Sequence, residues 1–157
     1  AMESALLAGD LGSIAEKVNI IRIGGSYYHL DVTFDNTLGR GGELRYDYFN
    51  LTDEQISKDH IFESAMELAK DKNDYFAMND KFFTSKKRLK SSLEISILKG
   101  DKYFGFRLPN TKNPEKTYQE ILLLIEETVK NTITRTISYS ISFNQKQMVI
   151  YIIFDIL

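Results

Sequence analysis

Apolar and polar positions in the first sixty residues form short runs that are typical of strands. Residues 18–23 are apolar and β-branched, a Gly-Gly-Ser sequence follows at 24–26, and residues 27–34 form a second strand-like run. Two such runs around a Gly-Gly turn predict a β-hairpin. Residues 36–43 are rich in Asn, Thr and Gly and predict an exposed loop, and the aromatic run 45–50 predicts a short strand.

Helix signals begin at Thr52. Gln55 follows three residues later, which is the spacing of a capping box. We expect this short helix to end near His60, and we expect a second short helix over residues 64–70.

The second half of the chain has longer and cleaner patterns. Short strands are predicted at 75–78 and 81–84 on either side of an Asn-Asp turn, and further strands at 103–108, 137–143 and 147–154. The last of these includes the longest apolar run of the chain, residues 148–154, which has the length of a strand.

Two longer helices separate these strands. Ser85 predicts the start of a helix that runs to about Leu98 and closes at Gly100. Pro114 predicts the first turn of a helix that ends near Asn131. The order is then ββαβαββ, so we predict an α+β fold in which helices cover one face of a mainly antiparallel sheet. We place a hairpin region at 1–60 and an α+β accessory domain at 61–157.

Composition narrows the class of protein. The 157 residues are 43% hydrophobic and 27% charged, with a net charge of -2. These values are typical of a globular chain and give no global field that would attract nucleic acid. No apolar run approaches the ~18–20 residues that span a bilayer, so we expect no membrane span. The chain has no cysteine, which excludes a thiol nucleophile of its own and leaves the cellular compartment open.

One segment resembles a known family. Residues 19–36 read NIIRIGGSYYHLDVTFDN, residues 46–54 read YDYFNLTDE, and residues 58–60 read KDH. These stretches resemble bacterial members of the transglutaminase-like superfamily, which are papain-related Cys-His-Asp domains. Residues 75–108 are more loosely similar to an accessory region of such proteins.

The resemblance implies that Asp31 stands at the position of the triad carboxylate, whose role is to orient and stabilise an imidazole. The family histidine would fall at Glu16, three residues before Asn19. A two-residue hairpin turn would put position 16 diagonally near Asp31. The cysteine is absent, and residues 1–15 are too few for its helix and the following strand. We therefore expect a catalytically incomplete C-terminal half, a pseudoenzyme.

Four further residues are candidates for binding beside Asp31. They share the predicted hairpin or its continuation, and they are Glu16, Asn19, His29 and Asp35. His29 and Asp31 would share one strand face, and Glu16 near Asp31 would pair two carboxylates. His60 is the only other histidine, so we expect neither a metal nor another cofactor. We interpret the basic run 81–90 as the solvated face of a helix start.

Three functions fit these features. The first is a non-catalytic domain that binds a protein or peptide or acts as a scaffold. The second is a truncated portion of a transglutaminase-like cysteine protease or acyltransferase. The third is a structural module that forms a homo-oligomer through the C-terminal strand, residues 148–154, if that strand lies at a sheet edge.

Overall fold

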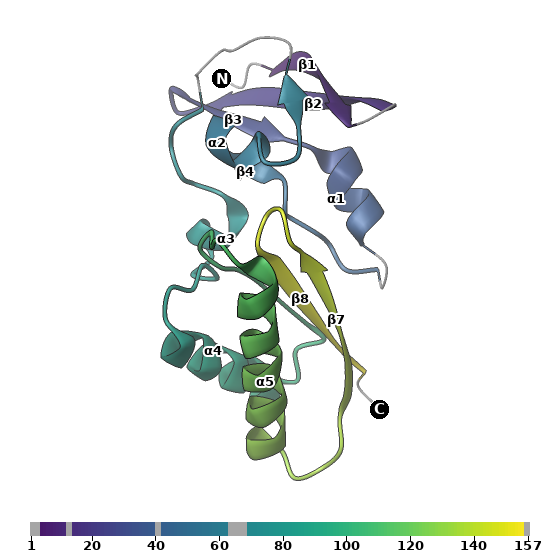
Figure 1. Ribbon diagram of the computed structural model, residues 1–157, viewed down its shortest axis with the longest axis vertical. Helices are drawn as coiled ribbons and strands as arrows, with labels where there is room; N and C mark the ends of the chain where they lie inside the picture. Colours follow the sequence, from purple (N-terminus) through teal and green to yellow (C-terminus); the bar gives the residue numbers. More distant parts are fainter. Residues whose placement is uncertain (1–3, 12–13, 40–41, 63–68, 156–157) are drawn as a thin grey trace. The chain divides into compact units, whose positions relative to one another are not determined.

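The computed structural model describes residues 4–11, 14–39, 42–62 and 69–155 (Figure 1). The chain forms two compact units, Ala1–Asn79 and Asp80–Leu157. Each unit contains one antiparallel sheet with helices, so the predicted α+β class is confirmed. The division into domains at 1–60 and 61–157 stays a prediction.

The first unit contains a five-stranded sheet in the order β4-β3-β2-β1-β5. Every neighbouring pair in it is antiparallel. The strands are β1 Ser4–Leu11, β2 Ile14–Ile23, β3 Ser26–Leu30, β4 Phe49–Leu51 and β5 Ile61–Phe62.

The hairpin predicted around the Gly-Gly turn is confirmed. Ile23 of β2 lies opposite Ser26 of β3, so Gly24 and Gly25 form a two-residue turn. Their φ angles are 58° and 91°. Such left-handed conformations are required in this kind of turn and are accessible to glycine without strain.

The second strand of the hairpin is shorter than predicted. β3 ends at Leu30, and residues Val32–Leu38 form helix α1 instead of continuing the strand. The reason is Asp31, whose side chain caps the helix by accepting a hydrogen bond from the Phe34 N–H at 2.9 Å. Alternating apolar residues after position 31 therefore belong to a helix, and the loop predicted from residue 36 begins only after Leu38.

The capping box at Thr52 is confirmed. The Thr52 hydroxyl accepts from the Gln55 N–H, and the Gln55 side chain accepts from the Thr52 N–H. The helix, α2 Asp53–Ile56, ends before His60, and the strand predicted at 45–50 is reduced to β4. Most of the helix predicted at 64–70 lies outside the described residues.

The strand predicted at 75–78 is wrong, because these residues form the helical turn α3 Tyr75–Met78. This turn buries Phe76 completely and stacks the Tyr75 ring on Tyr46, with ring centroids 3.9 Å apart. A four-residue apolar run does not distinguish a strand from a buried helical turn. Residues 81–84 contribute a single bridge, between Phe82 and Arg107, so the first two strands of the predicted ββαβαββ order are not formed.

The second unit follows the predicted order from its first long helix onward. Ser85 and Asn113 cap the two long helices, and Gly100 closes the first of them with a φ of 74°. The elements are α4 Lys86–Lys99, β6 Tyr103–Arg107, α5 Pro114–Thr132, β7 Ser138–Asn144 and β8 Val149–Asp155.

The C-terminal strand is central in its sheet. The order is β6-β8-β7, and β8 pairs with both neighbours along its length. The predicted edge position of this strand is therefore wrong. Its continuous apolar sequence suits a central strand, and its backbone groups are already paired on both sides.

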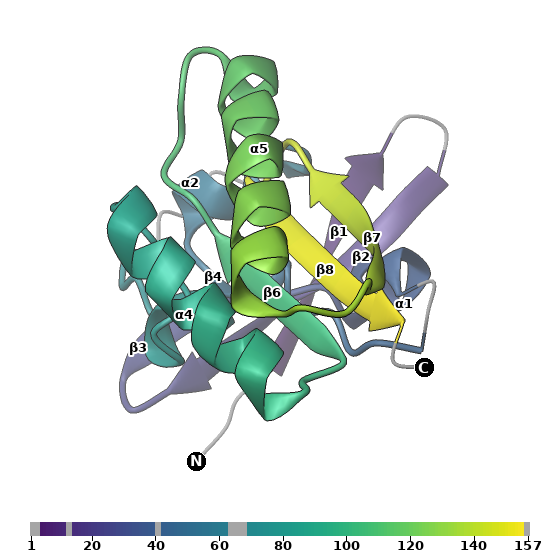
Figure 2. The ribbon, with the colours of Figure 1, turned by 90° about the horizontal axis from the view of Figure 1, so that it is seen from below.

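One face of this sheet carries the core of the second unit, and α4 and α5 cover it (Figure 2). Leu89 and Leu93 of α4 and Ile125 of α5 pack against strand residues that share this face. No helix in the described ranges is both long and apolar enough to cross a membrane.

Candidate functional site

Asp31 lies at the centre of a buried polar network in the first unit. Its side chain is almost fully buried, with 1% of the residue exposed. One carboxylate oxygen accepts from the Phe34 N–H at the start of α1. The other lies 3.1 Å from Nε2 of His60, which is 2% exposed. The Asp31 N–H donates to the carbonyl of Tyr48 at 3.1 Å.

The network continues through His60. Its Nδ1 lies 2.8 Å from Oδ1 of Asp59, and the Tyr48 hydroxyl donates to Oδ2 of Asp59 at 2.6 Å. The rings of Phe34 and Tyr48 pack against the imidazole, with centroids 5.5 and 5.2 Å from it. A histidine thus joins two carboxylates inside an aromatic enclosure.

The charge of His60 follows from these partners. Burial alone favours the neutral ring and lowers the pKa, but hydrogen bonds and charge from Asp31 and Asp59 outweigh burial and raise the pKa to about 9. At neutral pH the ring is therefore an imidazolium that donates from both nitrogens. Neither nitrogen is left to accept a proton from a substrate.

Asp35 belongs to a second buried cluster beside this network. Its Oδ1 accepts from the Tyr48 N–H at 3.1 Å. Burial, followed by the negative charge of Asp47, raises the Asp35 pKa to about 7. Asp47 itself accepts two hydrogen bonds from Arg45, both at 2.9 Å, and Glu43 lies 4.0 Å from the same guanidinium.

His29 is engaged elsewhere. It is 2% exposed, and its Nε2 lies 2.5 Å from Oδ1 of Asp53, while Oδ2 of Asp53 accepts from the Ala69 N–H. The expected face shared by His29 and Asp31 does not form, because β3 ends at Leu30. His29 thus fixes the start of α2 and does not join the Asp31 network.

The remaining predicted residues lie in β2. Asn19 is half-buried and lies opposite Leu30, and Glu16 lies opposite Gly9 of β1. The side chain of Glu16 lies outside the described part of the structure. The β2–β3 register ends at the pair of Asn19 and Leu30, so the hairpin that was expected to bring position 16 diagonally near Asp31 does not extend to Asp31.

Sequence reasoning missed His60, Asp59 and Tyr48 as members of the site. The adjacent Asp59 and His60 were visible only as part of the family resemblance. The sequence did contain one signal for these residues. Asp59 directly precedes one of only two histidines, just after a helix with a predicted cap. The sequence does not reveal that the fold brings His60 beside Asp31, at the N-terminus of α1.

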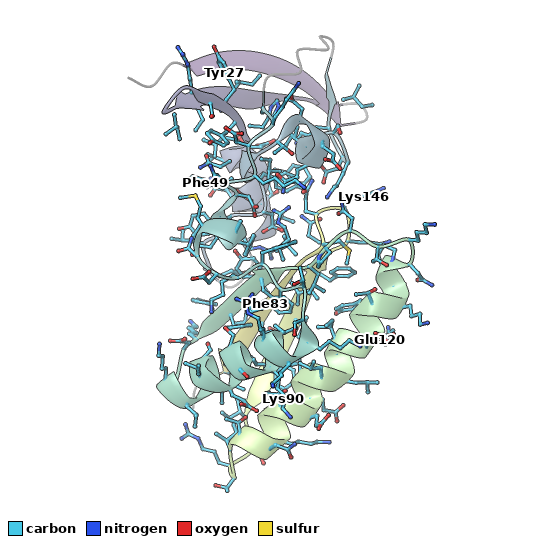
Figure 3. The ribbon with its side chains drawn as sticks, turned by 90° about the vertical axis from the view of Figure 1, so that its left-hand side faces the viewer. Tyr27, Phe49, Phe83, Lys90, Glu120 and Lys146 are labelled. Carbon is cyan, nitrogen blue, oxygen red and sulfur yellow. The ribbon has the colours of Figure 1, made fainter. Side chains whose placement is uncertain are left out.

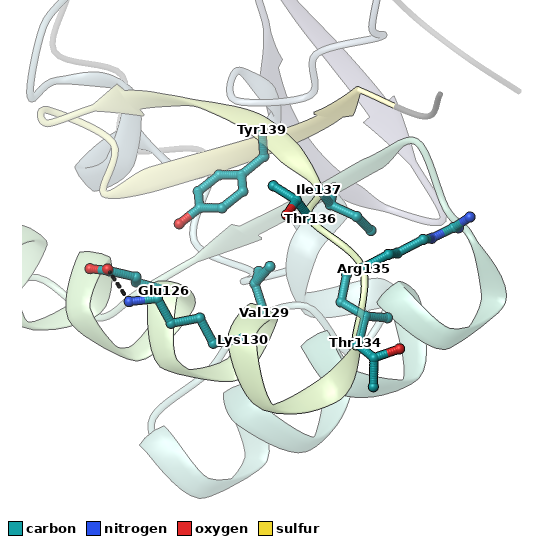
Figure 4. Close-up of a pocket in the computed structure, with 9 residues that line it drawn as sticks. Glu126, Val129, Lys130, Thr134, Arg135, Thr136, Ile137 and Tyr139 are labelled. Atoms are coloured by element: carbon teal, nitrogen blue, oxygen red, sulfur yellow. Dashed lines mark hydrogen bonds and ion pairs between the residues drawn. The ribbon is translucent and has the colours of Figure 1, made fainter.

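The second unit has a groove between the last turns of α5 and the start of β7, with a volume of about 460 Å³ (Figure 4). Val129, Ile137 and Tyr139 contribute its apolar walls, and an ion pair joins Lys130 to Glu126 at 2.8 Å beside them. The charged residues that line the groove are exposed to solvent. This groove therefore lacks the buried acid and base groups that distinguish the Asp31 network.

Among the described residues, no group of three or more acidic or histidine side chains is arranged to hold a metal ion. In the network around His60, the carboxylates of Asp31 and Asp59 flank the imidazole ring and offset its positive charge.

Comparison of the chain with models of protein families gives no match, and a search of curated proteins also gives none. The transglutaminase-like resemblance accordingly rests on the residues quoted for it.

Proposed function

We propose that this chain is a non-catalytic transglutaminase-like domain that acts as a binding or scaffolding module for a protein or peptide partner. The observation that carries this proposal is the state of Asp31. Its two oxygens are used inside the fold, one by the Phe34 N–H and one by His60. A carboxylate in this position holds elements together and does not face a substrate.

The chemistry of His60 supports the same conclusion. In a Cys-His-Asp site one imidazole nitrogen faces the thiol and shares its proton, so that the pair rests as thiolate and imidazolium, while the carboxylate holds the other nitrogen. His60 has a pKa raised to about 9, and both of its nitrogens contact carboxylates. The sequence contains no cysteine. The Asp31–His60 pair therefore has neither an imidazole nitrogen that faces a thiol nor the nucleophile for acyl transfer.

The role of the network is instead to hold three short segments together. It connects the N-terminus of α1 through Asp31, the segment before β4 through Tyr48, and the segment after α2 through Asp59 and His60. Removing one partner of a buried ion pair costs about 3–5 kcal/mol, because the other charge stays buried without compensation. Such a network keeps three short segments in one arrangement that can present a binding surface.

The test compares activity and binding in the same chain. We expect no turnover of glutamine-containing peptides with a primary amine, and saturable binding of a peptide or a peptidoglycan stem peptide in calorimetric titrations. Asp31→Asn should keep helix α1 capped, because Asn also caps helices, but should lower the stability of the first unit by about 2–4 kcal/mol.

Asp80→Asn is the matched control, since Asp80 is exposed and lies outside the network. It should unfold like the parent chain. Measurable acyl transfer by the parent, abolished in a folded Asp31→Asn variant, would show that Asp31 is catalytic and would refute the proposal. Failure of every peptide to bind would refute its binding part.

A further inference from the structure

The strand β7 lies at an open edge of the second sheet (Figure 2). It pairs with β8 on one side, and no other strand in the described part of the chain pairs with it. The opposite edge of the sheet is covered by the segment before α4. There the Phe83 N–H donates to the Arg107 carbonyl, and the Arg107 N–H donates to the Lys81 carbonyl. An open edge presents backbone donors and acceptors that can pair with another strand.

Hydrogen bonds on the β6 side of β8 set the direction of the backbone groups of β8. The Leu108 N–H donates to the carbonyl of Met148, and the Phe154 N–H donates to the carbonyl of Lys102. Even-numbered residues along β8 therefore point their backbone groups at β6. Because successive residues of a strand point these groups to opposite sides, the odd-numbered residues of β8 point theirs at β7.

The register with β8 then divides the residues of β7 into two sets. Its even-numbered residues, Ser140 and Ser142 among them, lie opposite odd-numbered residues of β8 and bond to that strand. Tyr139, Ile141 and Phe143 point their N–H and carbonyl groups away from β8. Their side chains pack against the core on the helix-covered face of the sheet, whereas their backbone groups form the open edge.

The sequence of β7 is nearly symmetric about Ile141. Read from either end, SYSISFN has a polar residue, an aromatic residue and a serine before the central isoleucine. Antiparallel pairing of two such strands about Ile141 places Tyr139 opposite Phe143 of the other copy, and Ser140 opposite Ser142. Aromatic pairs and hydroxyl pairs are favourable cross-strand neighbours. In this register the three residues that point outward meet three that also point outward, so their backbone groups can bond.

This strand has none of the features that protect edge strands from pairing. Its seven residues include no charge and no proline. The nearest charged residues along the chain are Arg135 and Lys146, which lies on the turn to β8 (Figure 3). The edge strands of the first sheet are shorter, since β4 has three residues and β5 has two. Short length, charges and prolines are the usual means of keeping an edge unpaired.

We propose that β7 pairs with β7 of a second copy of this chain, antiparallel and centred on Ile141. A two-fold axis through the Ile141 pair joins the two three-stranded sheets into one continuous sheet. Each copy uses its open edge, so association closes at a dimer. The inference goes beyond the proposed function and does not depend on Asp31.

The near-symmetry of β7 favours a second copy over an unrelated extended peptide. An unrelated strand would need only the open backbone groups, and it would give no reason for matched residues on the two sides of Ile141. A second copy matches side chains at every position of the strand. Because the contact is one strand wide, we expect a weak and reversible dimer.

Sedimentation velocity and NMR hydrogen exchange on the whole chain, from micromolar to millimolar concentration, test this pairing. We expect a monomer–dimer equilibrium. The amide protons of Tyr139, Ile141 and Phe143 face solvent in the monomer and enter hydrogen bonds in the dimer. Their exchange should slow at least about fivefold when most of the chain is dimeric. The amides of Ser140 and Ser142, already bonded to β8, are internal controls and should change little.

Charged variants at Ser140 test the register. Ser140 is exposed and lies diagonal to Ser140 of the other copy across the two-fold axis. Ser140→Lys and Ser140→Glu should each weaken dimerisation about threefold at low salt, because like charges then meet across the axis. An equimolar mixture of the two variants brings opposite charges together and should form heterodimers tighter than either homodimer. Ser91→Lys, at an exposed position of α4, is the control and should leave dimerisation unchanged.

Three results would overturn the proposed pairing. One is a parent chain that stays monomeric at every concentration or forms assemblies larger than a dimer. Another is a dimer in which the exchange of the Ile141 amide does not slow. The third is a mixture of the Ser140 variants that associates no more tightly than each variant alone, since association would then use another surface.

Discussion

At the residue scale, Asp31 is central to the candidate site, as the family resemblance implied, but its role differs from the expected one. The family resemblance pointed to Asp31, but its partner is His60 and not a residue of β2. Local sequence could not predict this pair, because the two residues lie 29 positions apart and meet only through the fold. Periodicity likewise predicted a strand through Asp31, since it does not weigh the capacity of a side chain to cap a helix.

Asp35 provides a test of the second buried cluster. Its pKa is raised to about 7, so its contribution to stability is complete below pH ~4 and is lost as the pH rises through about 7. Asp35→Asn removes this loss and still accepts from the Tyr48 N–H. Urea unfolding should show the variant more stable than the parent by about 1–2 kcal/mol at pH 8, and nearly equal to it at pH 4.

Asp47→Asn is the contrasting change, because it removes the bidentate partner of Arg45. It should destabilise the first unit at both pH values. If Asp35→Asn were less stable than the parent at pH 8, Asp35 would be better described as an ionised member of a favourable ion pair.

At the element scale, the sequence signals for helix ends were predictive, because each acts through a local hydrogen bond or backbone angle. The capping box at Thr52, the caps at Ser85 and Asn113 and the left-handed Gly100 all occur where the sequence placed helix ends. Short apolar runs were less informative, because a run of four residues has too few positions to reveal its period. That is why residues 75–78 form a helical turn and not a strand.

The capping box can be tested directly. Thr52→Ala removes the acceptor for the Gln55 N–H and should cost the first unit about 1 kcal/mol in chemical unfolding. Thr52→Ser keeps a hydroxyl and should recover most of that loss. Equal stability of the Ala and Ser variants would mean that the cap does not contribute.

Gly105 tests the packing of the second sheet. It lies directly opposite Tyr151, and a methyl group at this position would lie 2.6 Å from the tyrosine ring. Gly105→Ala should therefore destabilise the second unit by about 1–3 kcal/mol, because the ring must move from a packed position. Thermal unfolding followed by circular dichroism measures the change.

A double-mutant cycle separates the ring contact from strand propensity. In a Tyr151→Ala background the added methyl group meets no ring, so Gly105→Ala should become nearly neutral. An equal loss in both backgrounds would assign the effect to the backbone and contradict the packing argument.

At the scale of the whole molecule, the second unit has its own hydrophobic core and its own sheet and helices. Its apolar cluster is formed by α4, α5 and the strands of one sheet. We expect a fragment of residues 80–157 to keep its helical circular dichroism and to unfold cooperatively, although a domain of this size has only marginal stability. A gradual, non-cooperative transition would show that this unit depends on residues 1–79.

The proposed structural role of the Asp31 network depends on the charge of His60, whose buried ring lies between two carboxylates. The most direct measurement is a nitrogen-15 NMR titration of the histidine ring from pH 5 to 10. We expect both ring nitrogens of His60 to stay protonated at pH 7.5, with a pKa of about 9 that falls in Asp31→Asn. A neutral His60 ring at pH 7.5, with one unprotonated nitrogen, would show that the network is not a buried ion pair and would leave Asp31 and His60 available for acid–base chemistry.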